Sequence, residues 1–218
     1  KRLLEFNDAE YAEIDAYCKQ RGIEWLTSCW DAGSIDRMEK FNPSCHKIAS
    51  ACNEDDELML RARATGKPII LSTGMTDLAG VKTAVDIIGK ENLVILHCTS
   101  VYPKGAESNL DILKLINLRG INTLSEEFGV PVGFSSHDSG IQPTYAAVAR
   151  GAAMVEKHIT LERGMWGSDQ GSSVEPSGFI HLCGMIRQLP SVLGDGKITI
   201  YPAEEEVAKK LRRVRRKQ

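Results

Sequence analysis

The sequence predicts an α/β protein whose strands form part of a (β/α)8 TIM barrel. Short runs that are apolar on both faces alternate along the chain with helical patterns, as in parallel sheets that helices cover. Polar residues gather where these runs end, and a barrel places its active site at that face. An open, doubly wound sheet is the alternative, but no GxGxxG follows a strand, which weakens a dinucleotide-binding fold.

Six runs of the sequence are predicted to be strands. They cover residues 22–29, 46–50, 67–74, 92–100, 130–136 and 152–160. Six parallel strands are too few to close a (β/α)8 barrel, and the chain starts on a helix rather than a strand. We therefore expect only part of a barrel within these residues.

Helices are predicted between the strands from apolar spacing and from end signals. Residues 8–22 carry apolar residues at helical spacing and stop at a glycine. Residues 54–66 open on acidic residues and close on a glycine, and residues 174–189 have a proline near their start. Residues 104–116 are predicted to form a long loop or insertion, and long loops in compact domains are often functional.

The composition is that of a globular protein without a polyanionic partner. The 218 residues carry a formal net charge of −2 and are 42% hydrophobic. No apolar run approaches the roughly 18 residues of a membrane span, and the N-terminus has no signal-peptide core. These features predict a cytoplasmic protein that binds neither nucleic acid nor membrane. The six cysteines lack CxxC spacing and are interpreted as buried, reduced thiols.

The C-terminal residues are locally basic. Three glutamates, at 204–206, precede the basic run in an order that suits a helix dipole. A charged helix or linker is therefore favoured over a nucleic-acid-binding arm. The sequence divides into a barrel domain at residues 1–200 and a charged linker at residues 201–218.

Two of the five histidines stand at the ends of predicted strands. Alternate residues of a strand share a face, so Glu156 lies on the side of His158, and Ser135 on the side of His137. Two imidazoles from neighbouring strands, with open coordination positions, suit a catalytic divalent metal. Glu156 or Asp138 is expected to orient one of the rings. The alternative is that each ring only bonds a backbone carbonyl, and His97 is interpreted in that way as a packed core residue.

Hydroxyl residues and one lysine form a second polar group at the strand ends. An ammonium and several hydroxyls collected there would hold a phosphate or a carboxylate, although serine and threonine are also ordinary residues where strands turn into loops. Asp169 is interpreted as a sugar ligand or a turn residue, and Trp166 as a stacking platform or a packing residue. The members of the group are Lys47, Ser50, Ser72, Thr73, Ser100 and Ser135.

Several of these residues lie in strings that resemble the sialic acid synthase family, which includes N-acetylneuraminate synthase and the legionaminate and pseudaminate synthases. The strings appear in the family's order and approximate spacing over nearly the whole chain: KIAS, GKPIILSTGM, LHCTSVYP, NLRGI, PVGFSSHDSGI, EKHITLER and GSD followed by VEP. The resemblance implies a barrel that condenses phosphoenolpyruvate with an N-acetylated hexose, such as N-acetylmannosamine, to give a nonulosonic acid and phosphate. It also implies a bound Mn²⁺ or Mg²⁺ and a homodimer.

The resemblance assigns roles to individual positions. His137 and His158 match the family's metal ligands, and with Glu156 they form the expected catalytic group. Lys47, Ser50, Ser72 and Ser135 match its phosphoenolpyruvate-binding positions. The full set of expected substrate-binding residues is Ser28, Lys47, Ser50, Ser72, Ser100, Tyr102, Ser135 and Asp169.

The sequence also departs from the family pattern. Cys52 stands where relatives carry an acid, Ser136 where many have aspartate, and Gln170 where many have histidine. The first two βα units and a C-terminal antifreeze-like domain are expected outside these residues. Two other functions therefore remain in view: a metal-dependent barrel aldolase, and a non-catalytic ligand-binding fragment.

Overall fold

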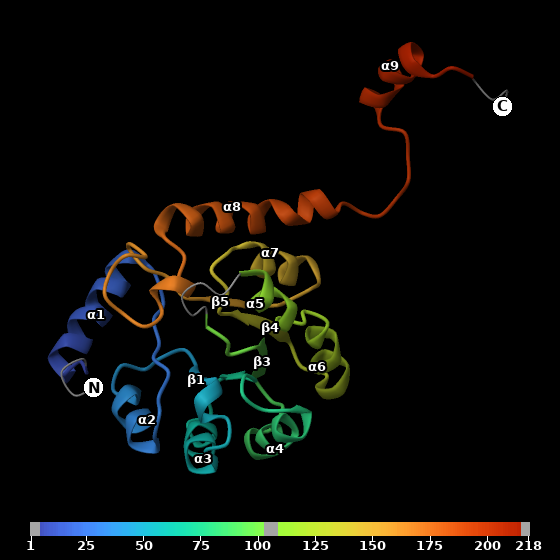
Figure 1. Cartoon of the computed structure of the whole chain (residues 1–218). Coiled ribbons are helices and arrows are strands. Elements are labelled where there is room, and N and C mark those ends of the chain that lie inside the picture. Colours follow the sequence, from blue (N-terminus) through green and yellow to red (C-terminus); the bar gives the residue numbers. More distant parts are fainter. Residues whose placement is uncertain (1–4, 103–108, 215–218) are drawn as a thin grey trace.

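A computed structural model of the chain describes residues 5–102 and 109–214, which form helices around one parallel sheet (Figure 1). Two 3₁₀ turns, at Ser50–Cys52 and Gln170–Ser172, lie in the connections after strands. In chain order the helices and strands are α1 (Asp8–Arg21), α2 (Ala32–Glu39), β1 (His46–Ile48), α3 (Asp56–Ala64), β2 (Ile69–Ser72), α4 (Leu78–Ile88), β3 (Leu93–Cys98), α5 (Asn109–Leu115), α6 (Gly120–Phe128), β4 (Val132–Ser136), α7 (Gln142–Ala149), β5 (Val155–Lys157), α8 (Pro176–Leu193) and α9 (Pro202–Leu211).

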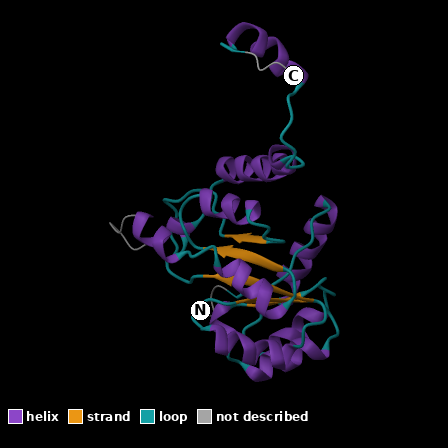
Figure 2. Cartoon of the chain, turned by 90° about the vertical axis from the view of Figure 1, so that its right-hand side faces the viewer, coloured by secondary structure: helices purple, strands orange, loops and turns teal. Residues whose placement is uncertain are grey.

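The sheet has five parallel strands whose spatial order is their chain order, from β1 to β5. In the turned view of Figure 2 the strands stack side by side with helices around them. Each crossover returns to the neighbouring strand, as in a (β/α)8 barrel, so the described residues form an α/β half-barrel.

One predicted strand, at residues 22–29, is not a strand in the structure. Only Ser28 pairs, through an isolated parallel bridge to Lys47. The neighbouring strand β1 is three residues long and offers little to pair with. Trp25 instead turns toward α1, where its indole N–H donates to Asp15 Oδ1 at 3.0 Å and its ring stacks on Tyr11. The described sheet therefore has five strands rather than the predicted six.

Two other predicted segments also differ from the structure. Within residues 104–116, predicted to be a loop, helix α5 covers Asn109–Leu115, and residues 104–108 lie outside the described part. The predicted strand at 152–160 is shorter, because β5 ends at Lys157 and Ile159 forms only an isolated bridge with Val174. The chain beyond β5 thus leaves the sheet and turns back across it.

The predicted helix at residues 8–22 is confirmed, together with its end signals. Asn7 accepts hydrogen bonds from the amides of Ala9 and Glu10, and the Glu10 carboxylate accepts from the Asn7 amide at 2.7 Å. This reciprocal capping box satisfies the first free N–H groups of the helix. Gly22 ends it in the left-handed conformation, with φ of 63°.

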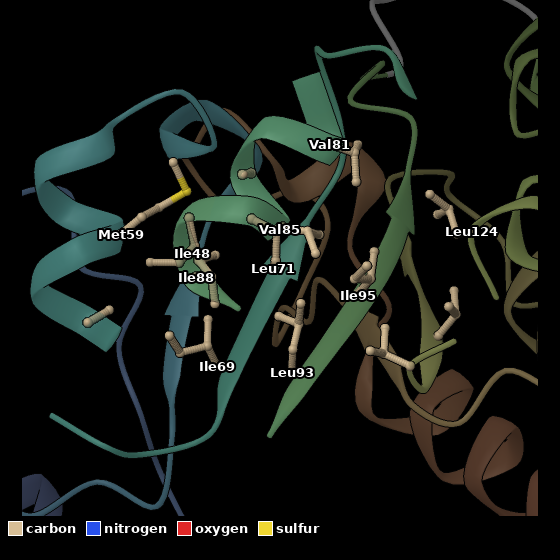
Figure 3. Packing of buried hydrophobic residues seen from close by; sticks show 14 of the residues in the cluster. Ile48, Met59, Ile69, Leu71, Val81, Val85, Ile88, Leu93, Ile95 and Leu124 are labelled. Carbon is tan, nitrogen blue, oxygen red and sulfur yellow. The ribbon is translucent and has the colours of Figure 1, made fainter. Parts of the chain in front are cut away.

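The hydrophobic core lies between the outer face of the sheet and the surrounding helices. Figure 3 shows Ile48, Ile69, Leu71, Leu93 and Ile95 of the strands packed against side chains of α3, α4 and α6. These strand residues alternate with others that point to the opposite side, because successive side chains in a strand face opposite ways. The outer face is therefore apolar and anchors each strand to a helix.

The inner face carries one polar residue near the carboxyl end of each strand. Cys98, Ser135 and Glu156 are direct partners in the register, whereas Lys47 pairs with Ile70 and Ser72 with Leu96, so the row is stepped at β1 and β2. The members of this polar row, in strand order, are Lys47, Ser72, Cys98, Ser135 and Glu156. Leu96, two residues before Cys98 on β3, faces the same inner side and is 1% exposed. The polar row is thus positioned by alternation within strands whose other face is fixed by the core.

The sheet is strongly curved, because its two outer strands approach each other on the inner side. Lys47 belongs to β1 and Glu156 to β5, yet Nζ of the lysine lies 3.5 Å from Oε1 of the glutamate. Gly133 of β4 helps this curvature: a Cβ there would lie 2.5 Å from the Met154 carbonyl oxygen and 2.6 Å from Leu96 Cδ2. A side chain at this position would push β5 or Leu96 away.

Gly133→Ala is therefore expected to lower the free energy of unfolding by about 1–3 kcal/mol, the usual cost of overpacking a core. The backbone carbonyl cannot move aside as a flexible side chain would. Urea denaturation monitored by circular dichroism measures the change. Gly184→Ala in α8 is the matched control, because no heavy atom lies within 4 Å of its added Cβ, and helix propensity there favours alanine by about 0.5–1 kcal/mol. A free energy of unfolding for Gly133→Ala equal to that of the parent protein would contradict the close approach.

The C-terminal part of the described chain leaves the body of the molecule. Helix α8 lies over the half-barrel and buries Leu182 and Leu189, whereas α9 has no buried residue and stands apart from it (Figure 1). The sequence favours a charged helix or linker in this region, and the structure has a helix at Pro202–Leu211. The boundary at residue 200 stays a prediction.

The structure also bears on the state of the cysteines and on membrane-spanning helices. All six cysteines are free thiols, and Cys29, Cys52 and Cys98 are buried while the other three are half-buried. Within residues 5–102 and 109–214, no helix is both long enough and apolar enough to cross a membrane.

Candidate active site at the carboxyl ends of the strands

One cavity of about 320 Å³ opens at the carboxyl ends of the strands and unites the predicted site. Its lining also includes Trp30, Ala49, Ala51 and Met75, which are not among the predicted site residues. All eleven residues predicted as catalytic or substrate-binding line it: Ser28, Lys47, Ser50, Ser72, Ser100, Tyr102, Ser135, His137, Glu156, His158 and Asp169. Parallel strands bring their carboxyl ends to one edge, so residues distant in sequence meet there.

Lys47 is the buried cation of the cavity. Its side chain is 5% exposed, and Nζ donates to Ser72 Oγ at 2.7 Å and to the Ile48 carbonyl at 3.2 Å. On the far side, Ser135 Oγ donates to Glu156 Oε2 at 2.6 Å. Burial lowers the pKa of the Lys47 ammonium, and the Glu156 carboxylate opposes this shift by favouring the charged form. The cavity thus holds a buried cation bonded to the Ser72 hydroxyl, with the Ser135 hydroxyl on the neighbouring Glu156, and a cation with hydroxyls suits a phosphate or carboxylate.

Gly74 brings the loop after β2 close to the site. Its amide donates to Ser50 Oγ at 3.0 Å, and a Cβ on Gly74 would lie 2.1 Å from Ser100 Oγ. Asn53 supports the same turn by donating to the carbonyls of Ser72 and Gly74. Neither residue is predicted as part of the site from the sequence. The only available signal was the glycine in LSTGM, which is a common turn residue.

The two histidines face each other across the other part of the cavity. Their ring centroids are 5.1 Å apart and the rings are tilted by 55°. The Tyr102 ring lies edge-on to His137, at 4.6 Å between centroids. His158 Nδ1 lies 3.8 Å from Asp169 Oδ2, and His137 Nδ1 lies 3.6 Å from Cys98 Sγ. The expected pairing of the two rings from adjacent strand ends is therefore present.

Both imidazoles sit in an environment that favours the neutral ring. Burial lowers the pKa of His137, and the nearby Glu156 carboxylate opposes that shift. Burial also lowers the pKa of His158, and the neighbouring His137 adds to the lowering. Neutral imidazole is the form that binds a metal ion.

The donor set fits a divalent ion with two protein ligands and open positions. Among the described residues, no three acidic, histidine or cysteine side chains are grouped as a complete metal cage. Two facing neutral imidazoles are what the chemistry of an open site needs, since water and substrate supply the remaining ligands. A metal held by His137 and His158 stays a prediction.

Glu156 or Asp138 is expected to orient an imidazole ring, but the hydrogen bonds and ion pairs of both carboxylates are made with other residues. Glu156 contacts Ser135 and Lys47, while Asp138 accepts hydrogen bonds from Ser136, Lys157 and the Gly140 amide. Among the described carboxylates at the site, Asp169 is the one within 4 Å of an imidazole nitrogen. The cause is strand alternation: Lys157 and Ser136 point to the outer face and bind Asp138 there.

Other predicted residues fall outside the cavity. Thr73 donates its hydroxyl to the Leu96 carbonyl, so it braces two strands rather than facing a ligand there. His97 meets the Ile116 carbonyl oxygen at 2.9 Å, which confirms its interpretation as a packed residue. Cys52 is buried, and Trp166 is 87% exposed. Gln170 donates to the Trp166 carbonyl at 3.2 Å, within the loop after β5.

The sequence of this chain is similar to those of known proteins. The family model described as NeuB family matches residues 1–198. An uncharacterized protein of Methanocaldococcus jannaschii is 35% identical over 96% of this chain and 61% of its own length. Human N-acetylneuraminate-9-phosphate synthase is 31% identical over 97% of this chain and 58% of its own length. The chain thus spans about three fifths of the length of these curated relatives.

Solved structures resemble the half-barrel closely. The crystal structure of an N-acetylneuraminic acid synthetase from Leptospira borgpetersenii, in complex with citrate, has a TM-score of 0.81 at 30% identity, and the match covers 96% of this chain and 73% of that one. A truncated 3-deoxy-D-arabino-heptulosonate 7-phosphate synthase from Thermotoga maritima has a TM-score of 0.73 at 16% identity over 87% of this chain and 74% of that one, which is a likeness of fold alone. Because the family model covers most of the sequence and the fold agrees, the chain belongs to the NeuB family.

Proposed function

We propose that the protein condenses phosphoenolpyruvate with an N-acetylated hexose and forms a nonulosonic acid and inorganic phosphate. The observation that carries this proposal is a single cavity in which a buried ammonium and several hydroxyls stand opposite a pair of imidazoles. The first group suits an anionic three-carbon donor, and the second suits a divalent ion beside a sugar carbonyl.

The relatives support this proposal by the reactions in their names. Proteins of Campylobacter jejuni that are 33% and 32% identical to this chain are an N,N'-diacetyllegionaminic acid synthase and a pseudaminic acid synthase. Their products, like that of the human relative, are acidic sugars. The proposal for this chain is therefore a synthase of the same product class, with the hexose left to experiment.

In the proposed reaction, C3 of phosphoenolpyruvate forms a carbon–carbon bond with the carbonyl carbon of the open-chain sugar. Water adds at C2, and phosphate leaves with its bridging oxygen. Lys47, Ser72 and Ser135 hold the phosphate and carboxylate of the donor, and Ser50 and Ser100 complete the pocket. Glu156, which lies between this pocket and the histidines, is the carboxylate that accepts the proton of the adding water.

The sugar is held on the other side of the cavity. Tyr102 and Asp169 present a phenol and a carboxylate to its hydroxyls, and His137 and His158 are the residues that would hold a divalent ion. When bound, that ion supplies Lewis acidity at the carbonyl oxygen. The protein's own contribution is to bring the two reacting carbons together and to hold the developing charge in a partly buried cavity.

The test is phosphate release from phosphoenolpyruvate that carries ¹⁸O in its bridging position. The protein is incubated with Mn²⁺ and with N-acetylmannosamine or related N-acetylated hexoses, phosphorylated and free. We expect sugar-dependent phosphate that contains the label, together with an acidic sugar detected by mass spectrometry. A metal-dependent aldolase would instead use pyruvate and release no phosphate. Binding of phosphoenolpyruvate without turnover on any sugar would contradict the synthase and support a ligand-binding role.

A further inference from the structure

A buried ion pair lies directly behind the histidines, on the outer side of the sheet. Lys157 precedes His158 and Asp138 follows His137 in the sequence. Their side chains are 3% and 0% exposed, and Lys157 Nζ lies 3.4 Å from Asp138 Oδ1. The proposed reaction uses neither residue, because both point away from the cavity that holds the substrates.

The hydrogen bonds of this pair hold the chain on both sides of His137. Lys157 Nζ donates to Ser136 Oγ at 3.1 Å and to the backbone carbonyl of Asp138. Ser136 Oγ in turn donates to Asp138 Oδ1, and Asp138 Oδ2 accepts the Gly140 amide at 2.8 Å. One ammonium therefore binds the residue before His137 and the residue after it.

The same ammonium belongs to the residue next to His158. Because side chains alternate along a strand, Lys157 points outward while Glu156 and His158 point into the cavity. The backbone of β5 is thereby tied to the loop after β4 at the positions that carry the two rings. A change in the hydrogen bonds of Lys157 would therefore alter the distance between the two imidazoles, although Lys157 contacts neither ring.

Stability alone is a weak reason for this arrangement. Removing two charges from water is costly, and replacing a buried ion pair by apolar residues is often neutral or stabilising. The charged pair differs from apolar residues in making hydrogen bonds, which hold the loop after β4 at specific atoms. We propose that Lys157 and Asp138 are positioning residues that set the distance between the His137 and His158 rings. This inference rests on the proposed metal-binding role of the two histidines.

The first test separates positioning from stability with charge-free variants. Lys157→Met combined with Asp138→Asn removes both charges, and the asparagine still accepts the Gly140 amide. We expect the melting temperature to stay close to that of the parent protein while Mn²⁺ affinity falls by about tenfold or more, as for outer partners of metal ligands. Mn²⁺ affinity is measured by calorimetry. Affinity within twofold of the parent would overturn the proposal.

Ile88→Ala is the matched control, because it removes a core side chain that is 1% exposed and lies on α4. It is expected to lower the melting temperature and leave Mn²⁺ affinity unchanged. If Mn²⁺ affinity instead fell in proportion to melting temperature in all variants, Lys157 and Asp138 would have a structural role only.

If the double variant does not fold, the Ser136→Ala variant is used as the test in its place. It removes one acceptor of Lys157, and we expect affinity to fall by about threefold, while unchanged affinity would overturn the proposal.

A second readout needs no metal. With selectively ¹³C-labelled histidine, nuclear Overhauser contacts between the two rings report their separation, which is 5.1 Å between centroids. We expect these contacts to weaken or disappear in the double variant, or in Ser136→Ala if the double variant does not fold, and to persist in Ile88→Ala. If the parent protein fails to bind Mn²⁺, the proposed function falls, and this measurement still judges the positioning role. Ring contacts that survive in the variant used would then overturn it.

Discussion

His137→Ala and His158→Ala are each expected to weaken Mn²⁺ binding by more than about 100-fold, since altering even an outer partner of a metal ligand costs 10–100-fold. Each change removes one of two imidazoles whose rings face each other at 5.1 Å. The remaining ring alone binds a divalent ion weakly, and synthase activity is expected to disappear with the metal. Isothermal titration with Mn²⁺ measures the affinity.

His181→Ala is the matched control for these two variants. His181 lies exposed on α8, outside the cavity, so its loss is expected to leave Mn²⁺ affinity unchanged. Each of the two site variants is also compared with the parent protein for phosphoenolpyruvate binding, which should change little. Parent-like Mn²⁺ affinity in both site variants would remove the histidine pair as a metal site.

Lys47→Met is expected to weaken phosphoenolpyruvate binding by about 2–5 kcal/mol, roughly 30-fold or more, the usual cost of truncating one partner of a buried charge pair. Methionine keeps most of the buried aliphatic stem, so the change mainly removes the ammonium. Glu156 then loses its partner but remains 42% exposed on its side chain, so water can solvate it. Calorimetric titration with phosphoenolpyruvate gives the dissociation constant.

Lys67→Met serves as the control for this prediction. Lys67 is half-buried and pairs with Glu39 at 3.1 Å, away from the cavity. It is expected to leave phosphoenolpyruvate affinity unchanged. In steady-state kinetics, Lys47→Met should raise the KM for phosphoenolpyruvate more than the KM for the sugar. An equal rise for both substrates would count against the placement of the donor beside Lys47.

Much of the site could be predicted because parallel strands collect their carboxyl ends at one edge. His137 and His158 were placed on the same side from alternation alone, and their rings do face each other. Helix α1 followed from its apolar spacing and its glycine stop. These features depend on local spacing, which a single sequence contains.

The rest depends on contacts between distant segments. Residues 22–29 read as a strand, but β1 is too short to pair with them and Trp25 packs on α1. Asp138 was expected beside an imidazole, but its partner is Lys157, which reaches it on the outer face. Gly74 and Trp30 were missed because a loop's approach to a cavity leaves no periodic signal in the sequence.

The contact between Lys47 and Glu156 also bears on how the protein forms during synthesis. Strand order equals chain order, so β1 leaves the ribosome first and β5 last among the five strands. Until β5 docks, Glu156 cannot pair with the Lys47 ammonium. A ligand that bridges both edges binds the finished sheet better than any partial one, and so stabilises it by mass action. Such a ligand would thereby raise the share of newly made chain that reaches the closed form.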